Sequence, residues 1–437
     1  MKKLLFILLL TIPFIGFGQG WEKTFGGGPM FGEIGNSVQQ TNDGGYIITG
    51  WTFSFGNGNS DVYLIKTDVN GVEQWSQTFG GTGWEEGRSV QQTTDGGYII
   101  CGDTESFGNG NGDVYLIKTN GNGVEQWSQT FGGTDVDRGR SVQQTNDGGY
   151  IICGSSYSTG NGEDDIYLIK TNGNGVEQWS QTFGGTENDR GHSVQQTNDG
   201  GYIICGYSKS IGIGLHHDFY LIKIDGNGNQ IWDQIFPQTN ESVGFSVRQT
   251  NDGGYIFTGH TETYGVGDGD VYLIKTNGNG VEQWSQTFGG TGYDGGYSVQ
   301  QTNDGGYIIT GWTFSFGNGN GDVYLIKTNG NGVEQWSQTF GGTGYDGGYS
   351  VQQTNDGGYI ICGEKGDLVN GTEDVYLIKT DSQGSLTSTF NIPTLSSKRK
   401  LVKIFDVLGR ETKLQTNTPF IEIYDDGSTE KKLIIKK

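Results

Sequence analysis

Residues 287–311 read TFGGTGYDGGYSVQQTNDGGYIITG, and residues 322–336 read DVYLIKTNGNGVEQW. Both stretches return along the chain with small changes. A unit of this length that returns many times indicates one supersecondary structure copied in tandem. The string DGGY begins at seven positions, 52 or 53 residues apart: Asp43, Asp95, Asp147, Asp199, Asp252, Asp304 and Asp356.

Each unit holds four strand-like runs, which in the second unit are Ser89–Thr93, Tyr98–Cys101, Val114–Thr119 and Val124–Phe131. Asp-Gly-Gly joins the first two runs and Asn-Gly-Asn-Gly the last two, and both sequences suit tight turns with positive φ. The third run is apolar on both faces, so its sheet must be covered on both sides. The last run is polar, as an outer edge strand should be. Seven such four-stranded sheets predict a seven-bladed β-propeller.

The composition agrees with an all-β fold. Glycine accounts for 81 of the 437 residues, the chain has 10 Trp, 22 Tyr and 22 Phe, and alanine is absent. Abundant glycine without alanine argues against a helical protein. The aromatic residues supply apolar surface to bury, which argues against a disordered chain, and the lack of a Gly-X-Y period excludes collagen.

The two ends of the repeat region predict how the ring closes. The chain enters the repeats with a run of the fourth type at Trp21–Phe25, whereas the seventh unit lacks the tryptophan run that would complete it. We therefore predict that Trp21–Phe25 forms the outer strand of the last blade. The alternative is that Leu386–Phe390 supplies this strand.

The quoted motifs resemble the SBBP-type seven-bladed β-propeller repeat of bacterial exported proteins, over about Gly20–Gly384. Kelch repeats are more distantly similar, through their Gly-Gly, Tyr and Trp. The resemblance implies the propeller fold, and it carries no catalytic motif.

The N-terminus has the layout of a secretory signal peptide. Lys2 and Lys3 precede an apolar stretch, and a small-x-small site places the expected cut after Gly18. No other stretch is apolar for long enough to span a bilayer, so we expect no transmembrane segment.

The C-terminal segment has little glycine and no tryptophan. Three strands are expected there, at Leu401–Val407, Phe420–Tyr424 and Lys432–Ile435, with turns at 408–410 and 425–427. Its motifs KIFDVLGRE, IEIYDDG and KKLIIKK resemble the type A C-terminal sorting domain of type IX secretion cargo. The resemblance implies a small β-sandwich-like domain, the type IX secretion machinery as a partner, and secretion across a bacterial outer membrane to the extracellular space or the cell surface.

The predicted organisation is therefore a signal peptide at 1–18, a propeller at 19–390 and a sorting domain at 391–437. Residues 4–385 hold 15 Lys and Arg against 43 Asp and Glu, in a chain of formal net charge −22. A surface this acidic repels phosphate backbones, so we expect no nucleic-acid partner. We expect a soluble monomer; recruitment of cations or basic partners is the alternative interpretation of the charge.

One end of the predicted ring is variable. Loops between the second and third strands share this end with the blade-to-blade connections, and both differ between units, whereas the NDGG and NGNG turns at the other end are nearly constant. Loop aromatics on a rigid scaffold suit a platform for a glycan or a protein ligand, although packing between neighbouring loops is an equal alternative. The candidate ligand-binding residues are Trp51, Phe53, Trp84, Tyr207, His260, Tyr293, Trp312 and Tyr345.

The cysteines occupy one repeat position, where other units have threonine. Equivalent positions on adjacent blades should lie too far apart to bridge, so we expect buried free thiols. These cysteines are Cys101, Cys153, Cys205 and Cys362.

No cofactor is expected. The four histidines, His192, His216, His217 and His260, show no metal-ligand spacing such as HExxH. Runs such as Asn109–Asp113 and Asn318–Asp322 offer oxygen ligands for Ca²⁺, but they lack the acidic density of an EF-hand and are better explained as turns.

No nucleophile–base motif is present, so no catalytic residue is assigned. The leading hypothesis is a non-enzymatic binding or adhesion module. A carbohydrate-active enzyme that uses acids of the variable face and a structural surface component are the alternatives. The acids that such an enzyme would use are Glu85, Glu86, Asp137, Asp189 and Glu262.

Overall fold

The computed structural model describes residues 20–27, 32–212, 216–367, 371–386, 401–406, 410–413, 419–424 and 429–432. The chain divides into two compact units, Met1–Ser388 and Thr389–Lys437. Every regular element among the described residues is a strand, and none of these residues forms a helix that could span a membrane. The expected signal peptide lies outside the described residues.

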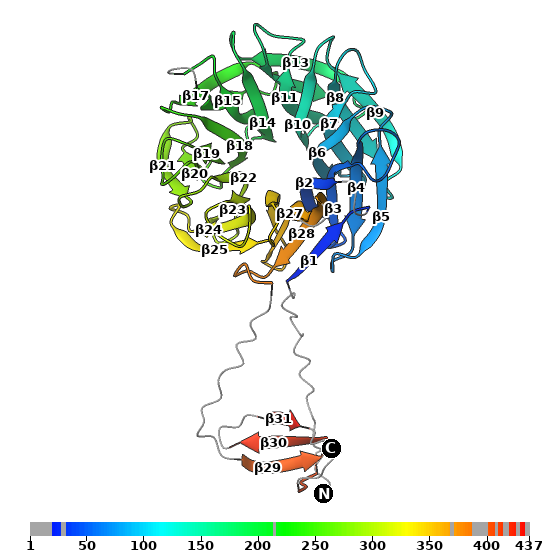
Figure 1. Ribbon diagram of the computed structural model, residues 1–437, viewed down its shortest axis with the longest axis vertical. Coiled ribbons are helices and arrows are strands. Elements are labelled where there is room, and N and C mark those ends of the chain that lie inside the picture. The colour runs from blue at the N-terminus through cyan, green and yellow to red at the C-terminus, as the bar shows by residue number, and fades with distance from the viewer. Residues whose placement is uncertain are drawn as a thin grey trace, which may run out of the picture. The chain divides into compact units, whose positions relative to one another are not determined.

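Seven four-stranded antiparallel sheets form a propeller ring, as the repeat predicts (Figure 1). The innermost strands, one for each of blades 1 to 7, are β2 Glu33–Gln40, β6 Glu85–Gln92, β10 Asp137–Gln144, β14 Asp189–Gln196, β18 Ser242–Gln249, β22 Asp294–Gln301 and β26 Asp346–Gln353. The second strands are β3 Tyr46–Thr52, β7 Tyr98–Thr104, β11 Tyr150–Ser156, β15 Tyr202–Ser208, β19 Tyr255–Thr261, β23 Tyr307–Thr313 and β27 Tyr359–Asp367. The third strands are β4 Asp61–Thr67, β8 Asp113–Thr119, β12 Asp165–Thr171, β16 Asp218–Ile224, β20 Asp270–Thr276, β24 Asp322–Thr328 and β28 Thr372–Thr380. The outer strands are β5 Glu73–Phe79, β9 Glu125–Phe131, β13 Glu177–Phe183, β17 Gln230–Phe236, β21 Glu282–Phe288, β25 Glu334–Phe340 and, in blade 7, β1 Trp21–Phe25.

The ring closes through β1, and this prediction is confirmed. β1 pairs antiparallel with β28, with Trp21 opposite Lys379 and Phe25 opposite Val375. Phe25 is buried in the cluster that joins blade 7 to blade 1. The edge that Leu386–Phe390 would have filled is thus occupied by the N-terminal strand; residues 387–390 of that alternative lie outside the described residues.

A repeated contact locks each blade to the next. The outer-strand tryptophan of one blade packs on the first tyrosine of the next blade's second strand, as Trp75 does on Tyr98 with ring centroids 5.9 Å apart. The same tryptophan covers the turn glycine between the next blade's third and fourth strands, where Gly123 has φ +76° and a Cβ would lie 2.5 Å from Trp75. Only glycine fits this position, because the backbone is left-handed and the space is taken.

The inner strands are joined by side chains that accept hydrogen bonds across blades. Gln39 Oε1 accepts from the backbone N–H of Gln92 at 2.6 Å, and equivalent glutamines do so at five further blade junctions. The seventh junction is different, because Arg248 stands where the other blades have glutamine. An arginine has no acceptor to offer.

The C-terminal unit contains a three-stranded antiparallel sheet, β29 Leu401–Asp406, β30 Phe420–Tyr424 and β31 Thr429–Lys432. The first two strands agree with the predicted runs. The third begins three residues earlier than the predicted Lys432–Ile435, because the segment that pairs with β30 begins opposite Ile423 at Thr429. The predicted turn at 425–427, residues 408 and 409 of the other turn, and residues 433–435 lie outside the described residues.

Candidate functional site at the mouth of the central channel

Each innermost strand carries a β-bulge at the same place. The register shifts between an invariant glycine and an invariant serine, as between Gly87 and Ser89, and leaves the residue between them unpaired. Bulges re-aim side chains, and they are common beside functional sites. The glycine is required because a Cβ at Gly87 would lie 2.3 Å from Thr49 Oγ1 of the neighbouring blade.

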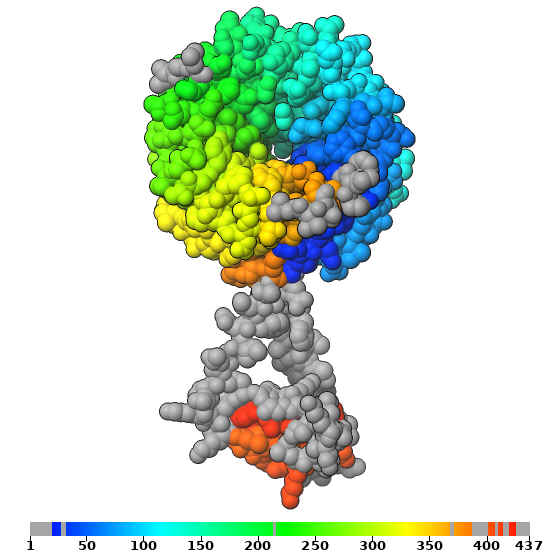
Figure 2. Space-filling model, in the orientation of Figure 1, coloured from blue at the N-terminus to red at the C-terminus, as the bar shows by residue number. Residues whose placement is uncertain are grey.

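The bulged residue is the one variable position inside an otherwise constant Gly-x-Ser-Val segment. These residues line one cavity of about 380 Å³, together with Trp51 and Arg248. Figure 2 shows the hollow at the centre of the ring where the channel opens. We call this cavity the channel mouth. Its bulged residues, in blade order, are Asn36, Arg88, Arg140, His192, Phe245, Tyr297 and Tyr349.

The bulged residues of blades 2 to 4 form a polar wall. Arg88 pairs with Glu86 and lies 3.8 Å from Asp103; burial lowers the pKa of its guanidinium to about 10, so it stays charged at neutral pH. Arg140 has no carboxylate within ion-pair distance among the described residues. Burial, followed by nearby arginines, lowers the pKa of His192 well below its usual value, so its ring is neutral at pH 7.

The bulged residues of blades 5 to 7 form an aromatic wall. Phe245 and Tyr297 have ring centroids 4.6 Å apart, and Tyr297 meets Tyr349 edge to face at 5.1 Å. Tyr349 donates a hydrogen bond of 2.5 Å to Glu364 Oε1 on the adjacent strand β27. Burial, with repulsion from Glu373 and Asp346, raises the pKa of Glu364 to about 7 despite that hydrogen bond.

The eight residues predicted for the variable face fall into three groups. Trp51, Phe53 and Trp84 contact one another in blades 1 and 2, with centroids 4.9 and 5.1 Å apart, and Trp51 reaches the channel mouth. Trp84 is 44% exposed. The predicted meeting of the two kinds of loop at one end is confirmed, since Ser60 O accepts from Glu85 N at 2.9 Å.

The second group lies on blades 5 to 7. Tyr293 stacks on Trp312 with centroids 5.1 Å apart and an interplanar angle of 3°, and His260 lies against Tyr293 at 5.5 Å. Phe314 links Trp312 to Tyr345. The aromatic residues of this group thus pack on one another, as the packing alternative expects, and their role as a ligand platform stays a prediction.

Tyr207 stands apart and is buried. Its ring lies 5.6 Å from His192 and 4.5 Å from His217, and only 7% of the residue is exposed. It lies on β15, beside the strand β14 that carries His192, and it does not line the channel mouth. Tyr207 therefore suits a supporting position better than a direct ligand contact.

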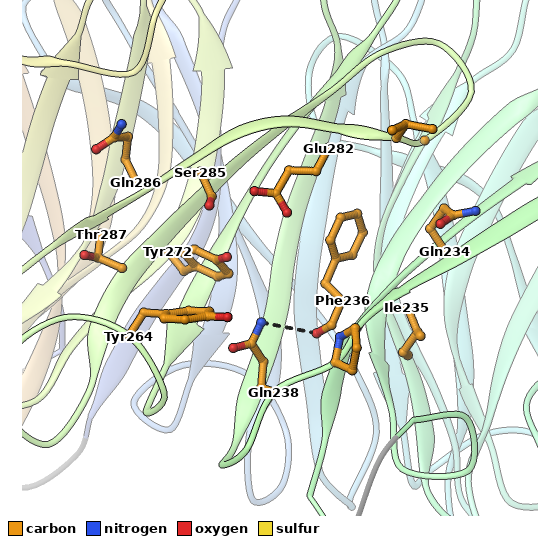
Figure 3. A pocket seen from close by; sticks show the side chains of 13 residues that line it. Gln234, Ile235, Phe236, Gln238, Tyr264, Tyr272, Glu282, Ser285, Gln286 and Thr287 are labelled. Carbon is orange, nitrogen blue, oxygen red and sulfur yellow. Dashed lines mark hydrogen bonds between the residues drawn. The ribbon is translucent and has the colours of Figure 1, made fainter.

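A larger groove lies on the outside of the ring, between blades 4 and 5. It has about 660 Å³ and is lined by Tyr264, Tyr272, Glu282 and the turn Pro237–Gln238 (Figure 3). In Figure 3 the amide of Gln238 donates to Phe236 O, at 3.4 Å, and the two tyrosine rings lie one above the other. The equivalent groove between blades 1 and 2, lined by Phe107 and Tyr115, has the same construction. A hollow that recurs with the repeat is explained by blade geometry, so the channel mouth is the more specific site.

Three of the acids proposed for a glycosidase are structural. Glu85, Asp137 and Asp189 are fully buried and share one repeat position with Glu33, Asp294 and Asp346. Glu85 accepts hydrogen bonds from Thr104 Oγ1 and from the N–H groups of Gly81 and Ser106. The interpretation of these acids as non-recurrent is wrong. The same repeat position holds Glu in some blades, Asp in others and Ser in one, so its recurrence is not obvious from the sequence. Glu86 is held by Arg88, and Glu262 accepts from Tyr293 at 3.4 Å.

The cysteines are free and buried, as predicted. The described residues contain no group of three His, Cys, Asp or Glu side chains that could hold a metal. In the run Asn109–Asp113, the carboxylate of Asp113 accepts a hydrogen bond of 2.8 Å from the N–H of Asn109, so this carboxylate stabilises the loop to which it belongs.

No family model matches this chain, and no curated protein matches it. Sqt1 from Chaetomium thermophilum is 9% identical with a TM-score of 0.46, over 95% of this chain and 100% of that chain. A protein of unknown function from Dyadobacter fermentans is 10% identical with a TM-score of 0.46, over 82% and 97%. BamB from Moraxella catarrhalis is 11% identical with a TM-score of 0.43, over 83% and 99%. Likenesses at these levels assign neither a ligand nor an activity.

Sequence reasoning missed the bulged residues because they lie inside a strand rather than in a loop. The signal was present: seven copies of Gly-x-Ser-Val differ at x alone, while the flanking residues stay constant. A position that varies while its strand neighbours stay constant is not constrained by the core packing that determines the identity of those neighbours.

Proposed function

We propose that this protein is an exported, non-enzymatic binding module that holds a glycan or protein ligand at the channel mouth. The observation that carries the proposal is the convergence of the repeat's variable side chains on one cavity. Seven nearly identical blades build a symmetric scaffold, and the asymmetry that selective recognition needs is concentrated at the bulges. The walls differ in chemistry, with arginines on blades 2 and 3 and aromatic rings on blades 5 to 7.

Two further features support binding here. Arg88 Nε and His192 Nε2 are buried and have no hydrogen-bond partner among the described residues. Buried polar atoms without partners are costly, and a ligand or water at the mouth would satisfy them. A cavity of this size with aromatic lining and a few convergent polar groups is typical of small-molecule and oligosaccharide sites.

The proposed route to the outside uses the two ends of the chain. The signal peptide at 1–18 would direct export to the periplasm, and the segment 391–437 would direct passage through a type IX secretion system. This part of the proposal rests on the sequence motifs. Deleting residues 396–437 should trap the protein in the periplasm, whereas unchanged delivery to the medium or the cell surface would refute it.

The binding proposal is tested with the purified full-length chain on glycan and peptide arrays. Trp51→Ala and Tyr297→Ala change the channel mouth, and Phe107→Ala is the matched control, because Phe107 is an exposed aromatic residue of an outer groove. We expect the two mouth variants to lose the signal that Phe107→Ala keeps. Binding that survives both mouth variants would place the ligand elsewhere, and an empty array would favour a structural surface component.

A further inference from the structure

The arginines of the repeat region are distributed unusually. Residues 20–386 contain five arginines, all of which lie in innermost strands around the channel: Arg88, Arg138, Arg140, Arg190 and Arg248. The ten lysines of this region include the seven that repeat in the DVYLIK strands. Among residues 20–386, arginine thus occurs only in innermost strands, and Arg88, Arg140 and Arg248 line the channel mouth.

The carboxylates beside these arginines do not balance them. Arg88 is paired with Glu86 and Asp103, and Arg190 with Asp164. Arg138 and Arg140 have no ion-pair partner among the described residues, and both act on Asp164 only at longer range. Of the arginines that line the mouth, Arg140 and Arg248 thus have no ion-pair partner among the described residues, in a chain of strongly negative net charge.

Arg248 gives a second, independent indication. Its position is glutamine in the other six blades, where the side chain accepts an inter-blade hydrogen bond. Arg248 instead donates to Val247 O at 2.7 Å and lines both the mouth and the narrower channel below it. One blade thus departs from the repeat at this position and loses a hydrogen bond that the other junctions have. Such a departure is typical of a functional position.

Building on the proposed function, we infer that the channel mouth binds a terminal acidic sugar, with its carboxylate on Arg140 and its ring on the aromatic wall of Phe245, Tyr297 and Tyr349. Guanidinium groups match carboxylates in bidentate geometry, and the C–H face of a sugar ring stacks on aromatic side chains. A single carboxylate fits better than a polyanion, because the acidic outer surface repels a long chain of negative charges.

The test is titration calorimetry of the full-length chain with methyl glucuronide and, as neutral match, methyl glucoside. We expect the glucuronide to bind roughly tenfold more tightly, the size of one charge-assisted hydrogen-bonded contact. Arg140→Gln should remove this preference and Arg140→Lys should keep part of it. Lys209→Gln is the control: it removes one positive charge, paired with Glu187, from the loops of the same end.

The outcomes separate this inference from the proposed function. Equal binding of both sugars, lost in Tyr297→Ala, would keep the binding proposal and overturn the acidic ligand. The acidic ligand is also overturned if the glucuronide does not bind, or if Arg140→Gln leaves its affinity unchanged. Thermal melting of each variant shows whether the ring is intact, and Arg140→Lys provides the comparison if Arg140→Gln fails to fold.

Discussion

Lys66 Nζ lies 2.9 Å from Asp43 Oδ2, and this ion pair recurs in all seven blades. The lysine is almost fully buried between sheets and also donates to Thr67 O at 2.8 Å. Asp43 Oδ1 accepts from Thr41 Oγ1 and from Gly45 N. The aspartate of the DGGY turn therefore does two tasks: it shapes the first hairpin and neutralises a buried cation.

Asp43→Asn should destabilise the ring in a pH-dependent way. Burial opposes ionisation of Asp43, but hydrogen bonds from Thr41, Lys66 and Gly45 and the charge of Lys66 outweigh it and lower the pKa to about 2. A lowered folded-state pKa stabilises the protein above the ordinary value, and that stabilisation is lost as the pH falls towards 2. We expect a loss of about 1 kcal/mol at pH 7, reduced by the exposure of the carboxylate, and a shrinking difference below pH 4 in thermal melts.

Asp68→Asn is the matched control for that charge. Asp68 lies in an exposed turn of blade 1 where four of the other six blades have asparagine, as at Asn120. We expect no measurable change in melting temperature. An equal loss in both variants would show that the ion pair with the buried lysine contributes nothing.

Gly123→Ala should destabilise the protein more than Gly96→Ala. Both glycines have positive φ, +76° and +82°, but a Cβ at Gly123 would meet Trp75 at 2.5 Å, whereas Gly96 has open space around it. The left-handed backbone costs alanine roughly 1 kcal/mol at either position, and the clash adds to this at Gly123 alone. Urea unfolding of the two variants measures the difference, and equal midpoints would contradict the proposed blade lock.

Arg248→Gln should stabilise the fold and weaken binding at the same time. Glutamine would restore the acceptor for the N–H of Gln301 that six other blade junctions have, which is worth about 1 kcal/mol. It would also remove one of the cations that line the channel. Melting temperature and glucuronide affinity are the readouts; a variant that is less stable than the natural protein would refute the role given to this position.

Glu364→Gln should raise stability at high pH only. The pKa of Glu364 is raised to about 7 by burial and by Glu373 and Asp346. A raised folded-state pKa contributes stability below the ordinary value near 4.5 that is lost as the pH rises through 7. The variant should therefore match the natural protein at pH 4 and exceed it by at most about 3 kcal/mol at pH 9. A constant difference across this range would assign the effect to packing.

The sequence was sufficient to predict the ring, the strand order and the closing strand. The same pattern of strands and turns returns in seven units, so each assignment was supported by several copies. The tryptophan run at the N-terminus also marked the strand that the seventh unit lacks. The sequence was sufficient for the variable end as well. It did not place Arg140 or Tyr297 at the channel, because a bulge changes which face a side chain takes, and the variable position inside the Gly-x-Ser-Val segment does not by itself reveal a bulge. The sequence also made Glu85 and Asp137 look like residues outside the repeat pattern, because different residue types occupy the same buried hydrogen-bonding position in different blades.

The most direct test of the channel mouth as the binding site is a crystal structure of the full-length chain with its strongest array ligand. We predict ligand density at the centre of the ring, in contact with Arg140 and Tyr297. Density in the outer groove beside Tyr264, or on the loops around Trp84 with an empty channel mouth, would contradict this placement.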